Sequence, residues 1–518
     1  MRSLVSPLIS ARRAVAPGVS RFARAFSSSG GIEVGKLPVE TRLFINNEFC
    51  DGVGAAFDTI NPATEEVNAT VQEAGKADVD RAVKAAHKAF DSWSCADPAF
   101  RRDCLNRLAD LVMKHADQLA DIESRDNGKP RHIARHVDIP LVANVFRYYA
   151  GWADKIQGKS IPLTVNSDKY LAFTRHEPVG VVGQIIPWNF PLAMFSWKIG
   201  PAMATGCTTV LKTSEKTPVT GAMMGHLVRE AGFPEGVINI LSGWGTTTGH
   251  QIAVHPLVDK LAFTGSTKTA MRILEASRET GLKRTSLELG GKSPLIVFKD
   301  ADLDQALDIA ELGLFFNQGQ CCIASSRIFI EESVYDQFCE RAKERAEKRI
   351  VGDPFDPKTT QGPQVDRVQF DRVMDFIDSG KSEGATLLAG GNRHGSKGFF
   401  VQPTIFKDVK DDMKIAREEI FGPVMQLMKF KTVDEAIARA NASEYGLGAG
   451  VATRDIGRAL QVAKKLRAGT VYVNCYDVFD PAAPFGGFKD SGIGRELGEY
   501  GLEPYTEVKT VICDLSHK

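Results

Sequence analysis

Between residues 179 and 298, short apolar segments alternate with segments of helix length, and this alternation constrains the fold more than any other feature. The apolar segments have the length of buried strands and lie at 179–186, 208–212, 237–241, 260–263 and 294–298. The segments of helix length lie between them, at 191–205, 216–231, 246–254 and 266–280. Strands and helices that alternate in this way form a parallel sheet with helices on both faces. The predicted fold class is therefore α/β with a doubly wound parallel sheet, which binds ligands at the carboxyl ends of its strands.

The length of the chain indicates more than one domain. At 518 residues it exceeds what a single core ordinarily holds. Residues 78–93 place apolar side chains at helical spacing, which predicts an amphipathic helix before the first strand. After residue 300, helices expected near 302–315 and 333–349 begin a second α/β unit.

Charge and hydropathy exclude two kinds of partner. The 64 basic and 64 acidic residues balance, whereas binding to nucleic acid or to an anionic membrane calls for a basic excess. No apolar run reaches the roughly 20 residues that span a bilayer. We therefore expect neither nucleic acid nor a membrane as a partner.

The first 32 residues differ in composition from the rest of the chain. Residues 1–32 contain five arginines, seven serines and no acidic residue. This composition is typical of an organellar transit peptide, and residues 24–27 resemble a mitochondrial processing site. A disordered basic tail is the alternative. The transit-peptide interpretation predicts a protein of the mitochondrial matrix.

The cysteines indicate a reducing compartment and include one unusual pair. The nine cysteines form neither a disulfide framework nor a CxxC…CxxC metal site, so no metal is expected. Cys321 and Cys322 end the segment 315–322, after a turn that contains glycine. A thiol in this position is a candidate nucleophile, and the alternative is a pair of ordinary core thiols. A nucleophilic role would need electropositive surroundings or a base.

Two further residues could complete a catalytic site. Glu288 interrupts an apolar strand and precedes two glycines that let backbone approach a ligand, which suits a general base. Asn189 follows a strand and lies between Trp188 and Phe190, where a fixed amide donor suits an oxyanion hole. Taken alone, each has a simpler explanation: a solvated glutamate at a strand edge, and an asparagine that makes a turn.

A glycine-rich segment, 242–249, loosely resembles a dinucleotide-binding fingerprint. Its glycines follow the spacing G-x-G-x-x-x-G rather than G-x-G-x-x-G. Asp259, the acidic residue downstream, begins a strand instead of closing one. We interpret the segment as a turn whose backbone borders a cofactor at most.

Several motifs become specific when they are taken in order along the chain. Residues 184–191, 263–267, 287–294, 315–322, 418–424 and 484–496 read QIIPWNFP, FTGST, LELGGKSP, FFNQGQCC, EEIFGPV and PFGGFKDSGIGRE. In this order they resemble the aldehyde dehydrogenase superfamily, over nearly the whole chain from about residue 38. The segments TRHEPVG, NQGQCC and VNCYDVF resemble the mitochondrial and cytosolic classes 1 and 2 in particular.

The resemblance implies a catalytic mechanism. Cys322 would attack the aldehyde, and the Asn189 side chain together with the Cys322 backbone N–H would stabilise the oxyanion. The resulting thiohemiacetal would be oxidised to a thioester with NAD as the cofactor. Glu288 would then activate the water that releases the carboxylic acid. The chain is therefore expected to be an NAD-dependent aldehyde dehydrogenase.

The resemblance also implies the cofactor contacts. Lys212 and Glu215 would hold the adenosine ribose, where the carboxylate repels a 2′-phosphate and so favours NAD over NADP. Gly265 and Ser266 begin a helix whose N-terminal N–H groups suit the pyrophosphate. The contacts to the nicotinamide ribose and ring, followed by three secondary contacts, would be Glu419 and Phe421, then Ile186, Trp188 and Gln369.

The resemblance further implies an apolar aldehyde pocket. Its lining would be Phe190, Met194, Trp197, Phe316, Phe479 and Phe485. An aromatic tunnel without a fixed cation selects neutral, apolar aldehydes, so acetaldehyde and other aliphatic aldehydes are expected. Aromatic aldehydes, indole acetaldehyde and lipid-peroxidation products stay open. The chain departs from many relatives at Ala270, where glycine is usual, and at Ile323, where close relatives often have a third cysteine. The branched side chain of Ile323 would narrow or reshape the pocket.

Three structural parts and an oligomer follow from the same resemblance. Residues 33–158 and 179–290 would form the NAD-binding domain, and residues 291–490 the catalytic domain. Residues 159–178 and 491–518 would form strands that join a neighbouring subunit, in a homotetramer or else a dimer. The competing functions are a non-redox cysteine acyl-transferase or hydrolase, a coenzyme-A-acylating dehydrogenase and a non-catalytic structural homologue.

Overall fold

The computed structural model describes residues 36–516, and its largest sheet is built on the region of predicted alternation. Eight strands pair in the order β19-β11-β10-β7-β8-β9-β1-β2. Their bounds are Gly492–Ile493, Arg284–Glu288, Lys260–Thr264, Val181–Ile185, Thr208–Lys212, Ile238–Leu241, Leu43–Ile45 and Glu48–Cys50, in the same order. The strands from β11 to β9 run parallel, which confirms the predicted α/β fold. β19 falls in the segment expected to join a neighbouring subunit, yet it pairs antiparallel with β11.

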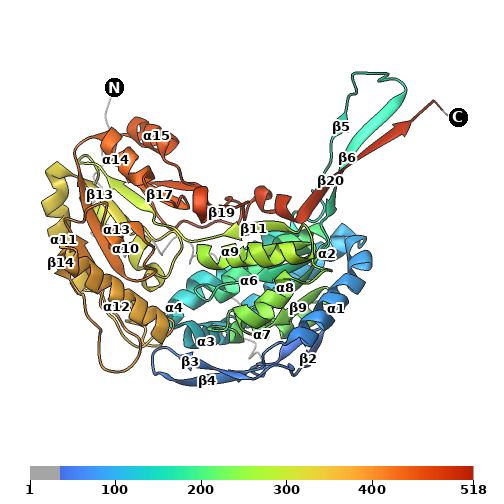
Figure 1. The fold of residues 1–518 in the computed structure, drawn as a ribbon, viewed down its shortest axis with the longest axis horizontal. Coiled ribbons are helices and arrows are strands. Elements are labelled where there is room, and N and C mark those ends of the chain that lie inside the picture. Colours follow the sequence, from blue (N-terminus) through green and yellow to red (C-terminus); the bar gives the residue numbers. More distant parts are fainter. Residues whose placement is uncertain (1–35, 517–518) are drawn as a thin grey trace, which may run out of the picture. The chain divides into compact units, whose positions relative to one another are not determined.

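Helices cover both faces of this sheet (Figure 1). On one face α1, α8 and α9 pack around a core that includes Val83, Ile252 and Ile273. The helices α2, α3, α5, α6 and α7 contribute to the core on the other side, with Leu108 and Phe146 among its members. The bounds of α1 to α9 are Lys76–Ser94, Pro98–Lys114, Ala116–Asn127, Arg131–Ile133, Ile139–Ala150, Pro191–Thr205, Val219–Glu230, His250–Ala253 and Thr267–Ser277.

Local sequence explains where these elements begin and end. β7 and β8 are buried at every residue, which is why apolar residues do not alternate with exposed polar ones along them. α6 has Pro191 in its first turn, where a missing N–H costs nothing, and it ends at Gly206, whose φ of 92° disfavours a side chain. α9 begins after Ser266, whose hydroxyl accepts a hydrogen bond from the Thr269 N–H.

A second sheet contains seven strands in the order β14-β15-β16-β13-β12-β17-β18. Their bounds are Thr386–Ala389, Thr404–Lys407, Val424–Phe430, Arg327–Glu331, Pro294–Val297, Gly448–Ala452 and Thr470–Val473, in the same order. The alternation grouped the segment 294–298 with the strands of the first sheet, whereas the resemblance placed it in the separate part 291–490. It forms β12 and pairs with β13 and β17, so the grouping from the alternation is wrong. An apolar run identifies a buried strand, yet it does not identify the neighbours of that strand.

The second sheet is also covered on both faces. In β12, Leu295 and Val297 belong to one core cluster and Ile296 to another, because successive side chains of a strand point to opposite faces. α10 and α11 contribute to the first of these clusters, and α12, α14 and α15 to the second. The bounds of α10 to α15 are Leu303–Phe315, Tyr335–Glu347, Arg367–Ser382, Lys414–Arg417, Val433–Asn441 and Ile456–Lys465.

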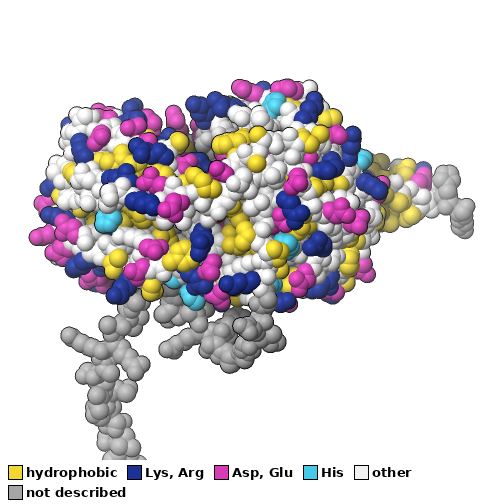
Figure 2. Space-filling view, turned by 90° about the horizontal axis from the view of Figure 1, so that it is seen from below, with side chains coloured by type: hydrophobic (Ala, Val, Ile, Leu, Met, Phe, Trp, Pro, Cys, Tyr) yellow, Lys and Arg dark blue, Asp and Glu magenta, His cyan; other side chains and the backbone are white. Residues whose placement is uncertain are grey.

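A third sheet joins segments that are far apart in the sequence. β20 (Thr506–Asp514) pairs antiparallel with β6 (Tyr170–Pro178), and β6 pairs with β5 (Ser160–Ile161). These strands extend away from the helices in Figure 1, and hydrophobic side chains gather on the projection in Figure 2. A separate hairpin consists of β3 (Phe57–Asn61) and β4 (Glu66–Val71).

The remaining sequence predictions on the fold concern the N-terminal region and membranes. The predicted transit peptide, residues 1–32, lies outside the described residues. The helix expected at 78–93 is confirmed as α1, which buries Val79, Val83 and Trp93. Within residues 36–516, no helix combines the length and the apolar character needed to cross a bilayer.

A buried arginine ties the second sheet to the end of α14. Arg327, at the start of β13, is only 3% exposed. Its guanidinium donates hydrogen bonds to the carbonyls of Lys292, Arg439 and Ala440 at 2.9, 3.2 and 2.9 Å. The planar group therefore joins the Lys292 carbonyl to two consecutive carbonyls at the end of α14, about 150 residues further along the chain.

Replacing Arg327 with methionine should destabilise the protein, because the buried carbonyls of Lys292 and Ala440 lose this donor, whereas the Arg439 carbonyl keeps the Ala442 N–H. Each unsatisfied buried polar group costs about 1–3 kcal/mol, so a loss of about 2 kcal/mol or more is expected. Scanning calorimetry would measure it as a lower unfolding temperature. Arg341→Met is the control, since Arg341 is partly exposed and pairs with Asp304 at the surface, where a pair is worth about 0–1 kcal/mol. Equal losses in both variants would contradict the prediction.

Candidate active site

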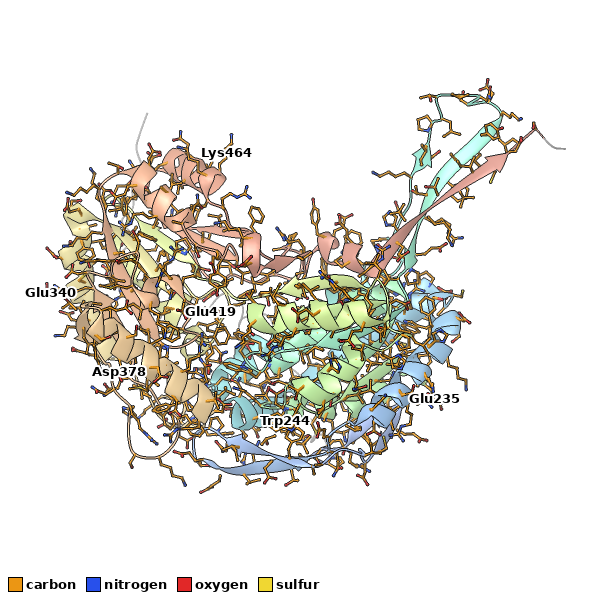
Figure 3. The ribbon with its side chains drawn as sticks, in the orientation of Figure 1. Glu235, Trp244, Glu340, Asp378, Glu419 and Lys464 are labelled. Carbon is orange, nitrogen blue, oxygen red and sulfur yellow. The ribbon has the colours of Figure 1, made fainter. Side chains whose placement is uncertain are left out.

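A cavity of about 270 Å³ is lined by loops from both large sheets. Asn189, Gly265 and Glu288 reach it from the carboxyl ends of strands in the first sheet, where a doubly wound sheet is expected to bind ligands. Cys322 and Glu419 reach it from loops of the second sheet. Figure 3 shows Glu419 between the helices of the two sheets. Segments that are far apart in the sequence thus converge on one cavity.

Most of the residues predicted for the site line this cavity. They are Asn189, Glu288 and Cys322; Trp188, Gly265, Ser266, Gln369, Glu419 and Phe421; and Phe190, Met194, Trp197, Phe316, Phe479 and Phe485. Three residues predicted as cofactor contacts do not line it. Ile186 is buried just after β7, and its backbone N–H donates to the Lys212 carbonyl at 3.1 Å. Lys212 ends β8 and Glu215 lies in the loop that follows, at the same edge of the sheet.

The loop that carries the cysteine pair has an unusual backbone. After α10, Asn317, Gln318 and Gly319 have φ angles of 48°, 59° and 75°, so three consecutive residues are left-handed. A Cβ on Gly319 would lie 2.2 Å from the Gly422 carbonyl, which only glycine avoids. Residues 316–322 are called the nucleophile loop here, after the candidate nucleophile Cys322. This loop therefore packs directly against the loop that contains Glu419. Strained backbone of this kind persists only where the surrounding structure enforces it.

The two cysteines of the pair differ in their surroundings. Cys321 is buried, whereas Cys322 is only partly buried, and both line the cavity. A hydrogen bond with Cys321, burial and the nearby Glu288 carboxylate all raise the pKa of the Cys322 thiol well above its usual value. The same hydrogen bond lowers the pKa of Cys321. Cys322 is therefore a neutral thiol that needs a base before it can attack an electrophile.

Glu288 is a candidate for that base. It ends β11 and is 3% exposed, and its Oε1 atom has no hydrogen-bond partner among the described residues. Burial, and after it the charge of Glu496, raises the pKa of Glu288 to about 8, while Lys198 and the Cys322 thiol act in the opposite direction. A carboxylate with this pKa accepts a proton near neutral pH, so it can deprotonate a thiol or a water molecule.

A buried ion pair behind Glu288 was missed in the sequence analysis. Lys198, on α6, contacts the Glu496 carboxylate and donates to Thr264 Oγ1 at 2.5 Å. Lys198 is completely buried, and it is the one charged residue of an otherwise apolar helix. That contrast was a usable signal, because a lone lysine in an apolar helix needs a partner.

The Asn189 amide is bound to the nucleophile loop. Asn189 follows β7 and is 5% exposed, and its Nδ2 donates to the Gln320 carbonyl at 3.1 Å. Gln320 lies two residues before Cys322. Since a carboxamide nitrogen carries two N–H groups, the second is free to bind an oxyanion at the thiol.

Aromatic rings form the apolar wall of the cavity. Phe190 stacks on Phe316 with 5.8 Å between ring centroids, and Trp197 meets Phe485 edge-on at 5.2 Å. Sequence reasoning missed the cation behind this wall: the Lys129 ammonium lies 4.4 Å from the Phe190 ring centroid.

The two departures from the family pattern are buried in the core. Ile323, expected to narrow the pocket, is fully buried beside Gly448 and is not among the described residues that line the cavity. The expected narrowing is therefore wrong. Ala270 is a fully buried residue of α9, and its methyl group joins the core that also includes residues of α1 and α8.

One end of the site has the polar groups that a dinucleotide requires. Lys212 Nζ donates to the Thr213 carbonyl at 2.7 Å and to Glu215 Oε2 at 3.3 Å, so a cation and a carboxylate lie side by side. Ser266 caps α9, whose first N–H groups carry the positive end of the helix dipole and suit a phosphate. The segment 242–249 forms a single helical turn, Gly245–Gly249, rather than the fingerprint loop.

The loop opposite Cys322 is held by several hydrogen bonds. Glu419 accepts a hydrogen bond from the Gly291 N–H at 2.9 Å, and burial raises its pKa to about 7. The Gln369 side chain donates to the Phe421 carbonyl at 2.8 Å, and the Phe421 ring meets Trp188 edge-on at 5.2 Å. The carboxylate and the aromatic ring suit a ribose and a flat heterocycle, so the donor set fits a nicotinamide nucleotide.

The fold and the site define an α/β enzyme with a cysteine, a buried carboxylate and an amide around one cavity. Residues 49–511 match the model of the aldehyde dehydrogenase family. The chain is 55% identical over 482 residues to "Aldehyde dehydrogenase 1A1" of Gallus gallus, covering 92% of this chain and 94% of that protein. It is 52% identical over 521 residues to "Aldehyde dehydrogenase, mitochondrial" of Rattus norvegicus, covering 99% of each. A solved NAD+ complex of the Bacillus cereus aldehyde dehydrogenase is 50% identical with a TM-score of 0.90, covering 92% of this chain and 97% of that one. The chain belongs to the aldehyde dehydrogenase family.

Proposed function

We propose that this enzyme oxidises aldehydes to carboxylic acids with NAD, through a thiohemiacetal and a thioester on Cys322. One observation carries the proposal: Cys322, Glu288 and Asn189 line a single cavity together with Gly265, Ser266 and Glu419. A thiol, a base and an oxyanion donor are the groups that acyl chemistry needs.

The Cys322 sulfur forms a bond to the aldehyde carbon, and its proton passes to Glu288. The carbonyl oxygen becomes an oxyanion that accepts hydrogen bonds from Asn189 Nδ2 and the Cys322 backbone N–H. Bound NAD supplies the two-electron acceptor that converts this adduct into the thioester. Glu288 gives the proton that it took from the thiol to solvent and is a carboxylate again. It then takes a proton from water, the water oxygen adds to the thioester carbon, and the carbon–sulfur bond breaks. The sulfur leaves as a thiolate that takes back this proton from Glu288 as the acid is released.

The cofactor contacts remain those that the resemblance implied. Lys212 and Glu215 would hold the adenosine ribose. Gly265 and Ser266 would hold the pyrophosphate. Glu419 and Phe421 would hold the nicotinamide riboside. Secondary contacts would come from Ile186, Trp188 and Gln369. The first sheet would thus act as the NAD-binding domain and the second as the catalytic domain. The NAD+ complex of the Bacillus cereus relative supports this choice of cofactor.

Apolar aldehydes fit the ring-lined end of the cavity. Acetaldehyde and other aliphatic aldehydes are the proposed substrates, because Phe190, Phe316 and Trp197 offer no charged group for a polar chain. The competing non-redox acyl-transferase would use a cysteine–histidine pair, and the described residues that line the cavity include no histidine. Three reactions remain to be distinguished: oxidation with release of the acid, oxidation with acylation of coenzyme A, and acyl transfer without oxidation. Measuring NADH formation from acetaldehyde, with and without coenzyme A, separates them.

We further propose a homotetramer in the mitochondrial matrix. Exposed apolar side chains on the third sheet, Leu171, Val508 and Ile512, are the kind of surface that a neighbouring subunit would cover. A monomer by light scattering at micromolar concentration would contradict the assembly. The basic leader, residues 1–32, and the mitochondrial relative in rat support import. Cell fractionation that recovers the protein only in the cytosol would contradict it.

Cys322→Ala should abolish aldehyde oxidation, because the carbon–sulfur bond can no longer form. NAD binding, measured by titration calorimetry, and the unfolding temperature should stay unchanged. Cys321→Ala is the matched control and should lose far less activity, since its sulfur is buried beside the reacting one. Equal losses in the two variants would mean that the nucleophile is assigned to the wrong cysteine.

Glu288→Gln should slow hydrolysis of the thioester more than its formation. General-base catalysis contributes roughly 10²–10⁴-fold, so steady-state turnover should fall by about that factor while a rapid burst of NADH persists. In the wild type, hydrolysis should accelerate as pH rises and level off above about 8, where Glu288 is a carboxylate. Loss of burst and turnover together, with an unchanged pH profile for alkylation of Cys322, would contradict the assignment.

Glu215→Ala should improve the use of NADP, because a carboxylate repels the 2′-phosphate. The ratio of kcat/KM for NADP to that for NAD should rise by roughly tenfold or more. Glu235→Ala is the control: Glu235 is exposed, and in Figure 3 it lies far from Glu419, which lines the cavity. A wild-type enzyme that already uses both cofactors equally would refute the repulsion argument.

A further inference from the structure

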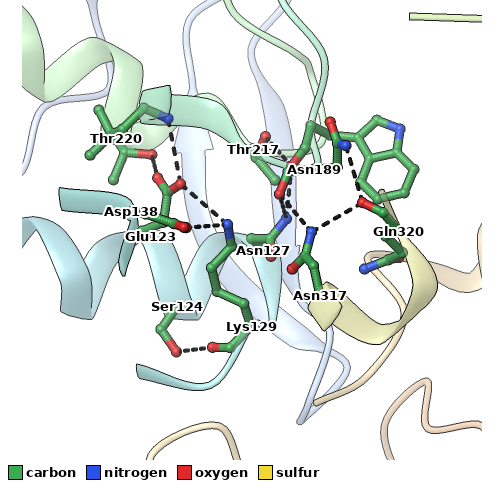
Figure 4. Close-up of polar contacts among 12 residues, drawn as sticks. Glu123, Ser124, Asn127, Lys129, Asp138, Asn189, Thr217, Thr220, Asn317 and Gln320 are labelled. Atoms are coloured by element: carbon green, nitrogen blue, oxygen red, sulfur yellow. Dashed lines mark hydrogen bonds and ion pairs between the residues drawn. The ribbon is translucent and has the colours of Figure 1, made fainter. Parts of the chain in front are cut away.

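Three side chains donate hydrogen bonds to the backbone carbonyls of Trp188 and Asn189, so they hold the backbone from which the Asn189 side chain extends (Figure 4). Asn127 Nδ2 donates to the Trp188 carbonyl at 2.8 Å and to the Asn189 carbonyl at 3.3 Å. Asn317 Nδ2 donates to the Asn189 carbonyl at 3.0 Å. Thr217 Oγ1 donates to the Trp188 carbonyl at 3.3 Å. Two consecutive carbonyls are thus each held by two donors.

The donors come from separate parts of the chain. Asn127 ends α3, Thr217 lies in the loop before α7, and Asn317 belongs to the left-handed segment of the nucleophile loop. Asn127 is completely buried and Asn317 is 5% exposed. In both, the amide oxygen has no hydrogen-bond partner among the described residues. The protein therefore tolerates two buried, unsatisfied acceptors in order to direct both amide nitrogens at these carbonyls.

Asn317 also connects the oxyanion donor to the nucleophile. Its Nδ2 donates to the Gln320 carbonyl at 3.2 Å as well as to Asn189, and the Asn189 side chain donates to the same Gln320 carbonyl at 3.1 Å. Asn189 is consequently fixed through both its backbone carbonyl and its side chain. Little freedom remains for the amide to rotate away from Cys322.

We infer that Asn127 and Asn317 are positioning residues for the oxyanion hole: by clamping the Asn189 backbone they hold its amide where the oxyanion forms. The inference rests on the proposed role of Asn189 as oxyanion donor. Electrostatic stabilisation of this kind requires donors that are already in place before charge develops, and a displacement of about 1 Å can cost on the order of 10²-fold in rate.

Asn127→Asp is the decisive change. The aspartate side chain has the same shape, but a carboxylate oxygen replaces the Nδ2 group that donates to the two carbonyls, and the carbonyl oxygens repel it. Two reactions of Cys322 separate the possible effects. Acylation by p-nitrophenyl acetate without NAD passes through an oxyanion, whereas alkylation by iodoacetamide is a displacement that forms none. Acylation should slow by roughly tenfold to a hundredfold. Alkylation, followed by mass spectrometry of the Cys322 peptide, should keep its rate and its pH profile.

Asn239→Asp provides the matched control. Asn239 is fully buried in β9, and its Nδ2 also donates to two carbonyls, those of Thr209 at 3.1 Å and Gly236 at 2.8 Å. The same chemical change there should lower the unfolding temperature but leave both reactions of Cys322 unchanged. Asn127→Ser, whose shorter side chain loses the two donors without adding charge, serves if the aspartate variant does not fold. It should slow acylation selectively as well.

Asn189→Ala separates this inference from the function it rests on. If acylation is insensitive to Asn189→Ala, the oxyanion assignment itself is wrong. If Asn189→Ala slows acylation but neither Asn127 variant does, the positioning role is overturned and the proposed function stands. A parallel fall in acylation and alkylation would also overturn it, because Asn127 would then act on the thiol. Selective loss of acylation in the Asn127 variants supports it.

Discussion

The close approach of two backbone segments, at Gly319 and Gly422, sets the geometry on which the rest of the site depends. A single added carbon on Gly319 would overlap the Gly422 carbonyl. Because of this contact the nucleophile loop and the Glu419 loop cannot move independently, although they belong to different parts of the second sheet. The hydrogen bond from Asn189 to Gln320 then carries the same constraint to the first sheet. The Cys322 thiol, the Asn189 amide and the Glu419 carboxylate are thus located relative to one another mainly by backbone packing.

Burial adjusts the chemistry that this geometry makes possible. Glu288, Glu419 and Lys292 are withdrawn from water, and burial moves their pKa values to about 8, 7 and 7. Groups that ionise near neutral pH can take up and release protons during a reaction at small cost. This burial costs stability, since Glu288 Oε1 and Lys292 Nζ have no hydrogen-bond partner among the described residues. At Glu288, which lines the cavity, the fold therefore gives up stability for a carboxyl group that titrates near neutral pH.

The sequence allowed most of the fold and most of the cavity lining to be predicted, and the failures have physical causes. Apolar runs located β7 to β10 because parallel strands are buried on both faces. The same signal put 294–298 in the first sheet, since pairing partners leave no trace in an apolar run. Lys198 and Lys129 were missed because their carboxylate partners, Glu496 and Asp138, are not recognisable from spacing alone. Ile323 was misjudged because adjacent residues of a tight loop can point into different environments.

The path of the last hundred residues has a consequence for how the protein is made. The chain completes the second sheet with β18, returns to the first sheet as β19, and only then forms β20 against β6. Glu496, the partner of Lys198 behind Glu288, is made after nearly everything else. Domains generally fold from the N-terminus as synthesis proceeds, but the first sheet of this chain is incomplete until β19 has emerged. A nascent chain that ends before residue 492 therefore carries Cys322 and Glu288 without β19 and without the carboxylate that pairs with Lys198.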